Sequence, residues 1–252
     1  MVYTWVLRWL RVGLVITVLG VCSWCDLRHR VVSDLIWILS YPLAILLCIL
    51  SFTYGALGAH ISLLFLLLLI SAMALLSLLL YFSGFLGGAD AFALVFIAIA
   101  FPDLGKALPV AFTTFFNSIL IMGFGVPLVI LILNIWRRNY RWLRLVHGSA
   151  LSKVLLLITA YPKKLSDISS HETPAVRAVE TRDKRVVLVP RHFYHAEHED
   201  PQEALRSMLD RLPSPPPRIW VTPFIPAMPF LLAGFILAVL GIDFLWLLVS
   251  LV

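Results

Sequence analysis

Charged residues are scarce in this chain, and their scarcity argues against an ordinary soluble domain. Only 13% of the 252 residues are charged, whereas 61% are hydrophobic. An ordinary soluble domain has about a quarter of its residues charged. Several apolar stretches reach or approach the roughly 20 residues needed to cross a bilayer. The composition therefore excludes an ordinary soluble domain and predicts a polytopic membrane protein.

Cysteine is also scarce. The three cysteines, Cys22, Cys25 and Cys48, lie in apolar stretches. An odd number in such positions provides no disulfide framework, and Cys22 with Cys25 lacks the second pair that a zinc site needs. We therefore expect packing roles for the three thiols, and we expect no bound metal or other cofactor.

Basic residues are scarce outside one segment. Fifteen of the 20 Lys and Arg, and nine of the 14 acids, lie between Arg137 and Thr222. This mixed distribution of the net charge of +6 argues against a nucleic-acid partner. Basic residues beside apolar spans typically mark the cytoplasmic side. The first, third and fifth loops are therefore expected in the cytoplasm, with both termini outside. Arg8 and Arg11 lie near the outward N-terminus and argue against this orientation, although they could snorkel from the first turns of the helix.

The apolar stretches predict six transmembrane helices. They are rich in leucine and lack the two-residue alternation of barrel strands, so helices are favoured. We expect an all-α polytopic membrane protein with transmembrane helices one to five in residues 1–136, a small α+β cytoplasmic subdomain in residues 137–222 and the sixth helix in residues 223–252. The expected spans are residues 4–25, 35–53, 60–82, 84–101, 108–136 and 223–250.

The polar segment shows a mixed pattern. Leu151–Pro162 and Lys184–Pro190 are typical of strands, and Asp200–Leu212 is typical of a short amphipathic helix. Pro213–Pro217 predicts a stiff extended linker. The histidines and acids of His192–Asp200 have a spacing that suits a transition metal, but their polar surroundings favour a solvated surface.

Glutamate is absent outside that segment, where only five acids occur, all aspartates. Ionisable residues at membrane depth are costly and are functional candidates. Asp34 precedes the second span and is expected to cap it, with Ser33 as the competing choice. Asp103 and Asp243 are expected toward the outer face.

Asp26 and Asp90 form the remaining pair. Asp26 ends the first span, and Asp90 lies about 9 Å inside the fourth if that span starts near Gly84. Both are expected on the cytoplasmic side, where they could meet across two packed helices. Two carboxylates in one low-dielectric cleft share a proton, so one can activate water while the other protonates a carbonyl oxygen. That is the chemistry of an aspartic peptidase.

The residues before Asp90 are Gly84, Gly87, Gly88 and Ala89. An aspartate at this place could simply cap a helix and benefit from its dipole. Glycines are not needed for a cap, but they permit an unusual backbone path and the close approach of another chain. We therefore expect this loop to form part of a substrate-binding cleft beside Asp90.

Two segments carry a resemblance to a known family. DLRHRVVSDLIW (Asp26–Trp37) and GFLGGADAFAL (Gly84–Leu94) resemble the paired signatures of the archaeal type IV prepilin and preflagellin peptidases, membrane aspartic peptidases of the GxGD class. Val221–Leu237 looks like the final span of that family. The strict pattern has glycine where Ala89 stands, and the archaeal branch resembles the version found here. Residues 165–212 show no such resemblance.

The resemblance implies that Asp26 and Asp90 are the catalytic pair. It also implies an endopeptidase that removes the short basic leader from type IV prepilin-like and prearchaellin precursors at the cytoplasmic membrane border. The expected partners are these precursors and the lipid bilayer. Two alternatives stay open: an intramembrane protease that cuts within a span, and a small proton-coupled transporter that uses Asp90.

Overall fold

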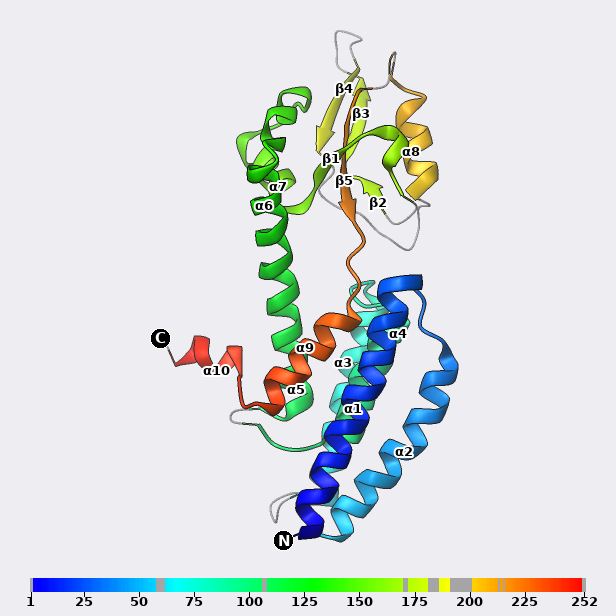
Figure 1. Ribbon diagram of the computed structural model, residues 1–252, viewed down its shortest axis with the longest axis vertical. Helices are drawn as coiled ribbons and strands as arrows, with labels where there is room; N and C mark the ends of the chain where they lie inside the picture. The colour runs from blue at the N-terminus through cyan, green and yellow to red at the C-terminus, as the bar shows by residue number, and fades with distance from the viewer. Residues whose placement is uncertain are drawn as a thin grey trace. The chain divides into compact units, whose positions relative to one another are not determined.

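The structure of the chain is a computed structural model that describes residues 2–57, 62–105, 108–169, 172–180, 186–190, 201–212, 214 and 216–250. The chain divides into two compact units (Figure 1). The helical unit comprises Met1–Met122 and Pro226–Val252, and the αβ unit comprises Gly123–Ile225. Each unit has a hydrophobic core of its own.

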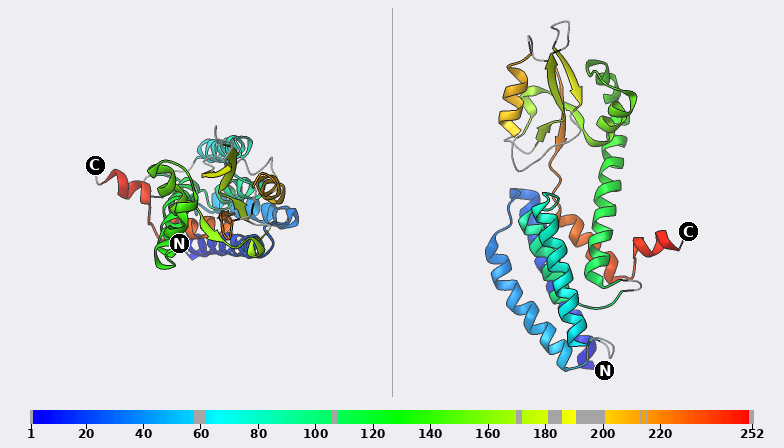
Figure 2. Two further views of the ribbon diagram at one scale, coloured as in Figure 1. Left: turned by 90° about the horizontal axis from the view of Figure 1, so that it is seen from above. Right: turned by 180° about the vertical axis from the view of Figure 1, so that it is seen from behind.

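The helical unit is built from helices alone over its described residues. They are α1 (Val2–His29), α2 (Asp34–Thr53), α3 (Leu63–Phe82), α4 (Gly88–Ala100), α5 (Val110–Leu120), α9 (Met228–Val239) and α10 (Phe244–Val249). Figure 2 shows α3 beside α4, and these two helices pack against each other.

Four helices are long and apolar enough to cross a membrane, which confirms the prediction of a mostly helical chain of membrane type. Within the described residues they are Tyr3–His29, Asp34–Thr53, Leu63–Phe82 and Val110–Trp136. Helices α4 and α9 have 13 and 12 residues, fewer than the roughly 20 that a crossing needs. The six full-length spans predicted from the sequence are therefore not all present as single helices.

A left-handed glycine precedes the short helix α4, and another follows the short helix α9. Gly84 adopts a positive φ of 72° after α3, and α4 begins only at Gly88, so the predicted start of that span was too early. The predicted last span is two helices, because Gly241 has a φ of 77° and Asp243 then caps α10 by accepting a hydrogen bond from the Trp246 N–H at 3.1 Å. A left-handed glycine commonly ends a helix.

The long helix Val110–Trp136 changes its winding near the middle. Between α5 and α6 (Val126–Trp136), the residues Ile121–Gly125 form a π-helical turn. Pro127 follows directly, and a proline in a helix removes a hydrogen bond and crowds the preceding turn. The extra residue of a π turn relieves such crowding.

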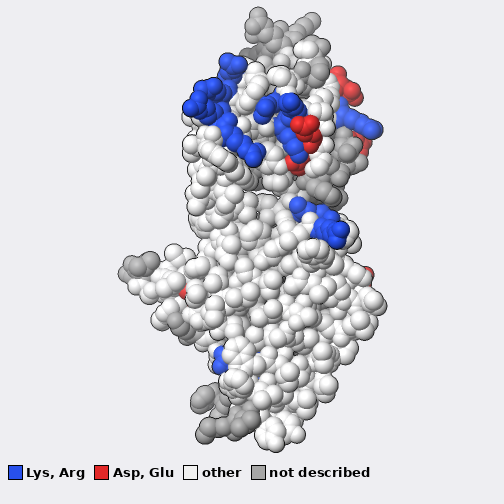
Figure 3. Space-filling model, viewed as in Figure 1, with Lys and Arg blue, Asp and Glu red and all other residues white. Residues whose placement is uncertain are grey.

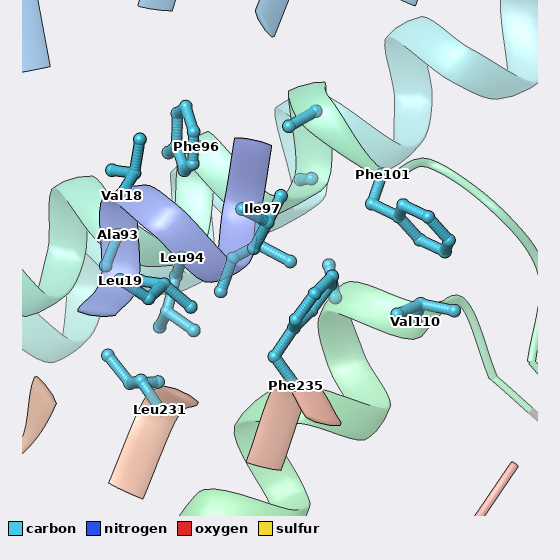
Figure 4. Packing of buried hydrophobic residues seen from close by; sticks show 14 of the residues in the cluster. Val18, Leu19, Ala93, Leu94, Phe96, Ile97, Phe101, Val110, Leu231 and Phe235 are labelled. Carbon is cyan, nitrogen blue, oxygen red and sulfur yellow. The ribbon is translucent and has the colours of Figure 1, made fainter. Parts of the chain in front are cut away.

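Helix α4 lies at the centre of the helical unit. Helices α1, α2, α3 and α5 all pack against it, and α9 packs against α1 and α5. Leu94 and Ile97 of α4 are fully buried beside Leu19 of α1 and Phe235 of α9 (Figure 4). Lipid is as apolar as these side chains, so close packing rather than water exclusion holds such helices together.

Two sequence predictions in the helical unit were wrong. Arg11 does not snorkel: it is fully buried and forms an ion pair with Asp103 at 2.5 Å. The side chain of Ser33, not that of Asp34, caps α2 by accepting a hydrogen bond from the Leu35 N–H at 3.4 Å. Serine has the shorter side chain, and Ser33 has extended backbone directly before the helix, which favours it as the cap.

The αβ unit combines helices with two small sheets. Its strands form an antiparallel sheet in the order β1-β5-β2 and a separate β3–β4 pair, which confirms the predicted small β-containing region. Beyond α6, its elements are η2 (Asn139–Leu145), α7 (Ala150–Thr159), β1 (Tyr161–Lys163), η3 (Leu165–Asp167), β2 (Glu172–Pro174), β3 (Val176–Glu180), β4 (Val186–Pro190), α8 (Pro201–Leu209) and β5 (Ile219–Pro223).

The sequence predictions for this unit are partly confirmed. Strand β4 and helix α8 lie where the sequence placed a strand and an amphipathic helix. Leu151–Pro162 was wrongly predicted as a strand, because α7 occupies most of it, capped by Ser149. The Asn134 side chain donates hydrogen bonds to the backbone carbonyls of Leu157, in the last turn of α7, and of Ala160, just after it. These bonds favour the helix. The cluster His192–Asp200 lies outside the described residues.

Candidate active site

Asp26 lies in the last turn of α1. Its side chain is half-buried, and its Oδ2 atom accepts a hydrogen bond from the backbone N–H of Met228 at 3.2 Å. Met228 is the first residue of α9, and Pro229 follows in the first turn, where proline suits a helix start. The bond joins the end of α1 to the start of α9 and directs a carboxylate at the positive end of a helix dipole.

Asp90 lies in the first turn of α4. Its side chain is also half-buried, and its Oδ2 atom accepts a hydrogen bond from the N–H of Gly87 at 3.2 Å. Gly87 is the N-cap residue of the helix, so Asp90 takes the position that a carboxylate has in a capping box. The structure thus gives Asp90 a structural contact that fixes its orientation at the helix start.

The charge of Asp26 acts on Asp90 as the smallest of three influences, after burial and the hydrogen bond from Gly87. Helices α1 and α4, which carry these aspartates, pack against each other. Neither Asp26 nor Asp90 forms an ion pair with any described residue. The site therefore contains two acidic groups on packed helices, with no described basic side chain that neutralises either one.

An aromatic cluster fixes α4 against α2. The Tyr41 hydroxyl donates a hydrogen bond to the backbone carbonyl of Phe92 at 2.8 Å. The ring of Trp37 lies 6.0 Å from that of Phe96, and Tyr41 lies edge-on to Phe96 at 5.8 Å. Such aromatic pairs contribute about 0.5–1.5 kcal/mol each. They hold the turn of α4 that follows Asp90.

The glycines before Asp90 differ in backbone conformation and in what a side chain at each position would contact. Gly84 has the positive φ that other residues adopt only at a cost. A Cβ atom on Gly87 would lie 3.3 Å from the Oδ2 atom of Asp90, whereas one on Gly88 would make an ordinary contact of 3.7 Å with Tyr81. Ala89 is half-buried. Their predicted role in binding a peptide stays a prediction.

The other aspartates outside the αβ unit have local roles. Asp103 pairs with Arg11, and Asp243 caps α10 and contacts the Thr113 hydroxyl at 3.4 Å. Asp34 is exposed at the start of α2. Within the described parts of the chain, no three His, Cys, Asp or Glu side chains gather as metal ligands would.

The sequence reasoning missed the contact between Asp26 and Met228. The predicted sixth span began at residue 223, whereas α9 begins at Met228. The start of this helix was therefore not expected to contact Asp26. The signal was present in Pro226 and Pro229, because prolines cluster just before and within the first turn of helices. The partner group is a backbone N–H, however, so the identity of residue 228 itself gave no sign of it.

Comparison with known proteins bears on the second half of the chain. Residues 152–244 match the family model described as Archaeal Peptidase A24 C-terminus Type II. This part of the chain is similar to the C-terminal region of the archaeal A24 peptidases. The match confirms the resemblance to the archaeal prepilin and preflagellin peptidase family. No curated protein matches the chain.

The archaeal A24 match covers a different part of the chain from the aspartates. It includes most of the αβ unit, helix α9 and the cap of α10, and it ends at residue 244. It therefore reaches Met228, whose N–H contacts Asp26, but neither Asp26 nor Asp90. The family supports a protease, and the roles of the two aspartates depend on the geometry described above.

Proposed function

We propose that this chain is a membrane aspartic endopeptidase in which Asp26 and Asp90 are the catalytic pair. The observation that carries the proposal is that the packed helices α1 and α4 carry two half-buried carboxylates, neither of which forms an ion pair with a described residue. The A24 peptidase match at residues 152–244 supports it independently of these residues.

The chemistry needs only the two carboxylates and a water molecule. Two acidic groups in one half-buried site share a proton, because both cannot easily be charged at short range. The charged carboxylate takes a proton from the water that attacks the scissile carbonyl, and the neutral one donates a proton to the carbonyl oxygen. The backbone N–H groups of Met228 and Gly87 would orient one oxygen of each carboxylate during this step.

The substrates we propose are type IV prepilin-like and prearchaellin precursors, cut between a short basic leader and the hydrophobic helix that follows it. We place the cut at the cytoplasmic membrane border, where the basic residues around Arg28 and Arg137 put this end of the helices. In this proposal α4 and α9, extended by their flanking residues, complete a set of six crossings.

The test is co-expression of the full chain with an epitope-tagged prepilin or prearchaellin, followed by a gel shift of the tagged precursor. Asp26→Asn and Asp90→Asn should each abolish the shift at unchanged membrane levels. The matched control is Asp34→Asn, because Asp34 is exposed and makes no capping bond, so cleavage should persist.

The Asn variants separate catalysis from helix capping. Asparagine caps a helix about as well as aspartate, so Asp90→Asn should preserve the contact with Gly87 while removing the titratable group. Full cleavage by Asp90→Asn would reduce Asp90 to a structural role and end the proposal. Absence of cleavage by the wild type, with several leaders, would favour the transporter alternative.

A further inference from the structure

The segment that follows the last long span gathers four arginines in one place. Helix α6 ends at Trp136, and Arg137 and Arg138 follow directly. Arg138 has a positive φ of 53°, which turns the chain sharply into the 3₁₀-helix η2. A non-glycine residue adopts this conformation at an energetic cost, and such strain is retained where the surrounding structure requires the turn.

The geometry of η2 aligns these side chains. A 3₁₀-helix has three residues per turn, so side chains three positions apart eclipse one another. Arg138 at its N-cap, Arg141 and Arg144 have this spacing and share one face. With Arg137 and Trp142 they line a hollow of about 570 Å³.

The charge of this arginine hollow is not neutralised within the described residues. All four guanidinium side chains are exposed, and the ion pairs found among those residues involve Arg11 and Lys163 instead. Lys and Arg gather on the αβ unit, whereas the face of the helical unit drawn in Figure 3 is mostly uncharged apart from a group of Lys or Arg at one end. A hollow with four guanidinium groups that form no ion pair with a described residue suits an anion with several oxygens.

Apolar and aromatic surface adjoins the arginines. Along α6, Leu128 and Ile132 are more than half exposed, and Trp136 at the end of the helix is 77% exposed. Tyr140 is 47% exposed within η2. Exposed aromatic residues at the end of an apolar span are typical of the level of lipid headgroups.

Helix α7 adds an apolar face of its own. Leu151, Val154 and Leu155 are exposed at the spacing of one helical face, whereas Leu156 is buried in the core of the αβ unit. Helix α7 packs against α6. An exposed apolar face beside a basic turn is the pattern of a segment that lies in the membrane interface.

We propose that Arg137, Arg138, Arg141 and Arg144 form a binding site for the phosphate headgroups of anionic lipids, with the exposed face of α7 lying in the interface beside it. The occupant follows from charge complementarity and from continuity with a helix long enough to cross the membrane, which ends at Trp136. Each arginine near an anionic surface contributes roughly fivefold to binding. The site is independent of the peptidase function.

The experiment uses the purified full chain in detergent and native mass spectrometry. The chain is titrated with phosphatidylglycerol and, separately, with zwitterionic phosphatidylcholine. The wild type should retain phosphatidylglycerol at least about tenfold better. The variant with Arg→Gln at 137, 138, 141 and 144 should bind the two lipids about equally, at an unchanged melting temperature because all four side chains are exposed.

A charge-matched control keeps the test specific. Lys164→Gln, Arg177→Gln, Arg206→Gln and Arg211→Gln together remove the same charge from exposed positions elsewhere in the αβ unit, and this variant should keep the lipid preference. An equal loss in the control, or no loss in the first variant, would overturn the proposal. Complete displacement of the lipid by inorganic phosphate at constant ionic strength would instead identify a free-anion site. Tighter binding of a short oligonucleotide than of the lipid would reassign the surface to nucleic acid.

Discussion

The buried ion pair between Arg11 and Asp103 leads to an asymmetric prediction. The Nη1 atom of Arg11 lies 2.5 Å from Oδ2 of Asp103, and Nη2 lies 3.3 Å from Oδ1. The guanidinium is also 5.0 Å from the centre of the Phe101 ring. The Arg11 side chain is fully buried, whereas that of Asp103 is 17% exposed. The two partners therefore differ in what happens when the other is removed.

Asp103→Asn leaves a buried guanidinium without its counter-charge, and breaking a buried pair in this way costs about 3–5 kcal/mol. Arg11→Met leaves an aspartate that water can still reach, and methionine fills most of the space of the arginine stem, so we expect a loss of about 1–2 kcal/mol. Domains are stabilised by about 5–15 kcal/mol in total, so the first loss is a large fraction of the whole.

The assay is thermal unfolding of the full chain in detergent. Unfolding is measured by chemical labelling of the Cys22 thiol, which is fully buried on α1 in the folded protein. The double variant Arg11→Met with Asp103→Asn should be more stable than Asp103→Asn alone, because the uncompensated charge is gone. Equal losses in both single variants, with additive losses in the double variant, would refute the account of the pair. Arg11 lies about 22 Å along α1 from Asp26, so folded variants should still cleave precursors.

Three further predictions concern single positions. Gly87→Ala should lower cleavage at least about tenfold in the gel-shift assay, because the new methyl lies 3.3 Å from the Asp90 carboxylate, whereas Gly88→Ala should change it less than about twofold; equal effects would contradict this. Gly234→Ala should prevent stable folding, since its Cβ would lie 2.6 Å from a backbone carbonyl of α5; a wild-type melting temperature would disprove the tight α5–α9 contact. Burial alone would raise the pKa of Glu172, but hydrogen bonds from a lysine, a backbone N–H and a tyrosine lower it below its usual value. The αβ unit should therefore lose about 1–3 kcal/mol as the pH falls below about 4, and Glu172→Gln should remove that acid lability in hydrogen-exchange measurements.

The sign of the Glu172 effect follows from the direction of the shift. A carboxylate whose pKa is lower in the folded state binds fewer protons there than in the unfolded chain at mildly acidic pH. Its contribution is present above the unfolded value and is lost as the pH falls through the folded value. Lys163 donates to both of its oxygens, at 2.9 and 2.7 Å, and the Ser169 N–H donates at 2.9 Å.

Hydrophobicity alone predicted the long helices well. A run of about 20 apolar residues leaves few alternatives, so the helices around Asp34–Thr53 and Leu63–Phe82 follow from composition. The breaks were harder to predict, because they depend on single residues. Gly84 and Gly241 adopt left-handed backbone in places where hydrophobicity is uninterrupted, and apolar runs therefore appeared longer than the helices they form.

Partners distant in the sequence were not predictable from local patterns. Arg11 was expected to reach solvent, because the residues near it in sequence give no sign that Asp103 forms an ion pair with it. The wrong prediction of a strand at Leu151–Pro162 has the same cause. Its leucines and isoleucine suit either structure, and the decision comes from Asn134, which binds the carbonyls of Leu157 and Ala160. Tertiary contacts of this kind override local propensity.

The position of Asp90 supports one of the three functions over the others. Helix α4 has 13 residues, or about 20 Å, against an apolar bilayer core of about 30 Å. Asp90 lies in the first turn of this short helix rather than at its centre, and the Gly84–Gly87 turn precedes it. A carboxylate that serves ion passage or cleavage within a span would be expected deep along a helix, near the midplane. A carboxylate at a helix start, with Asp26 in the last turn of the packed helix α1, suits a bond cut at the border between a polar leader and an apolar segment.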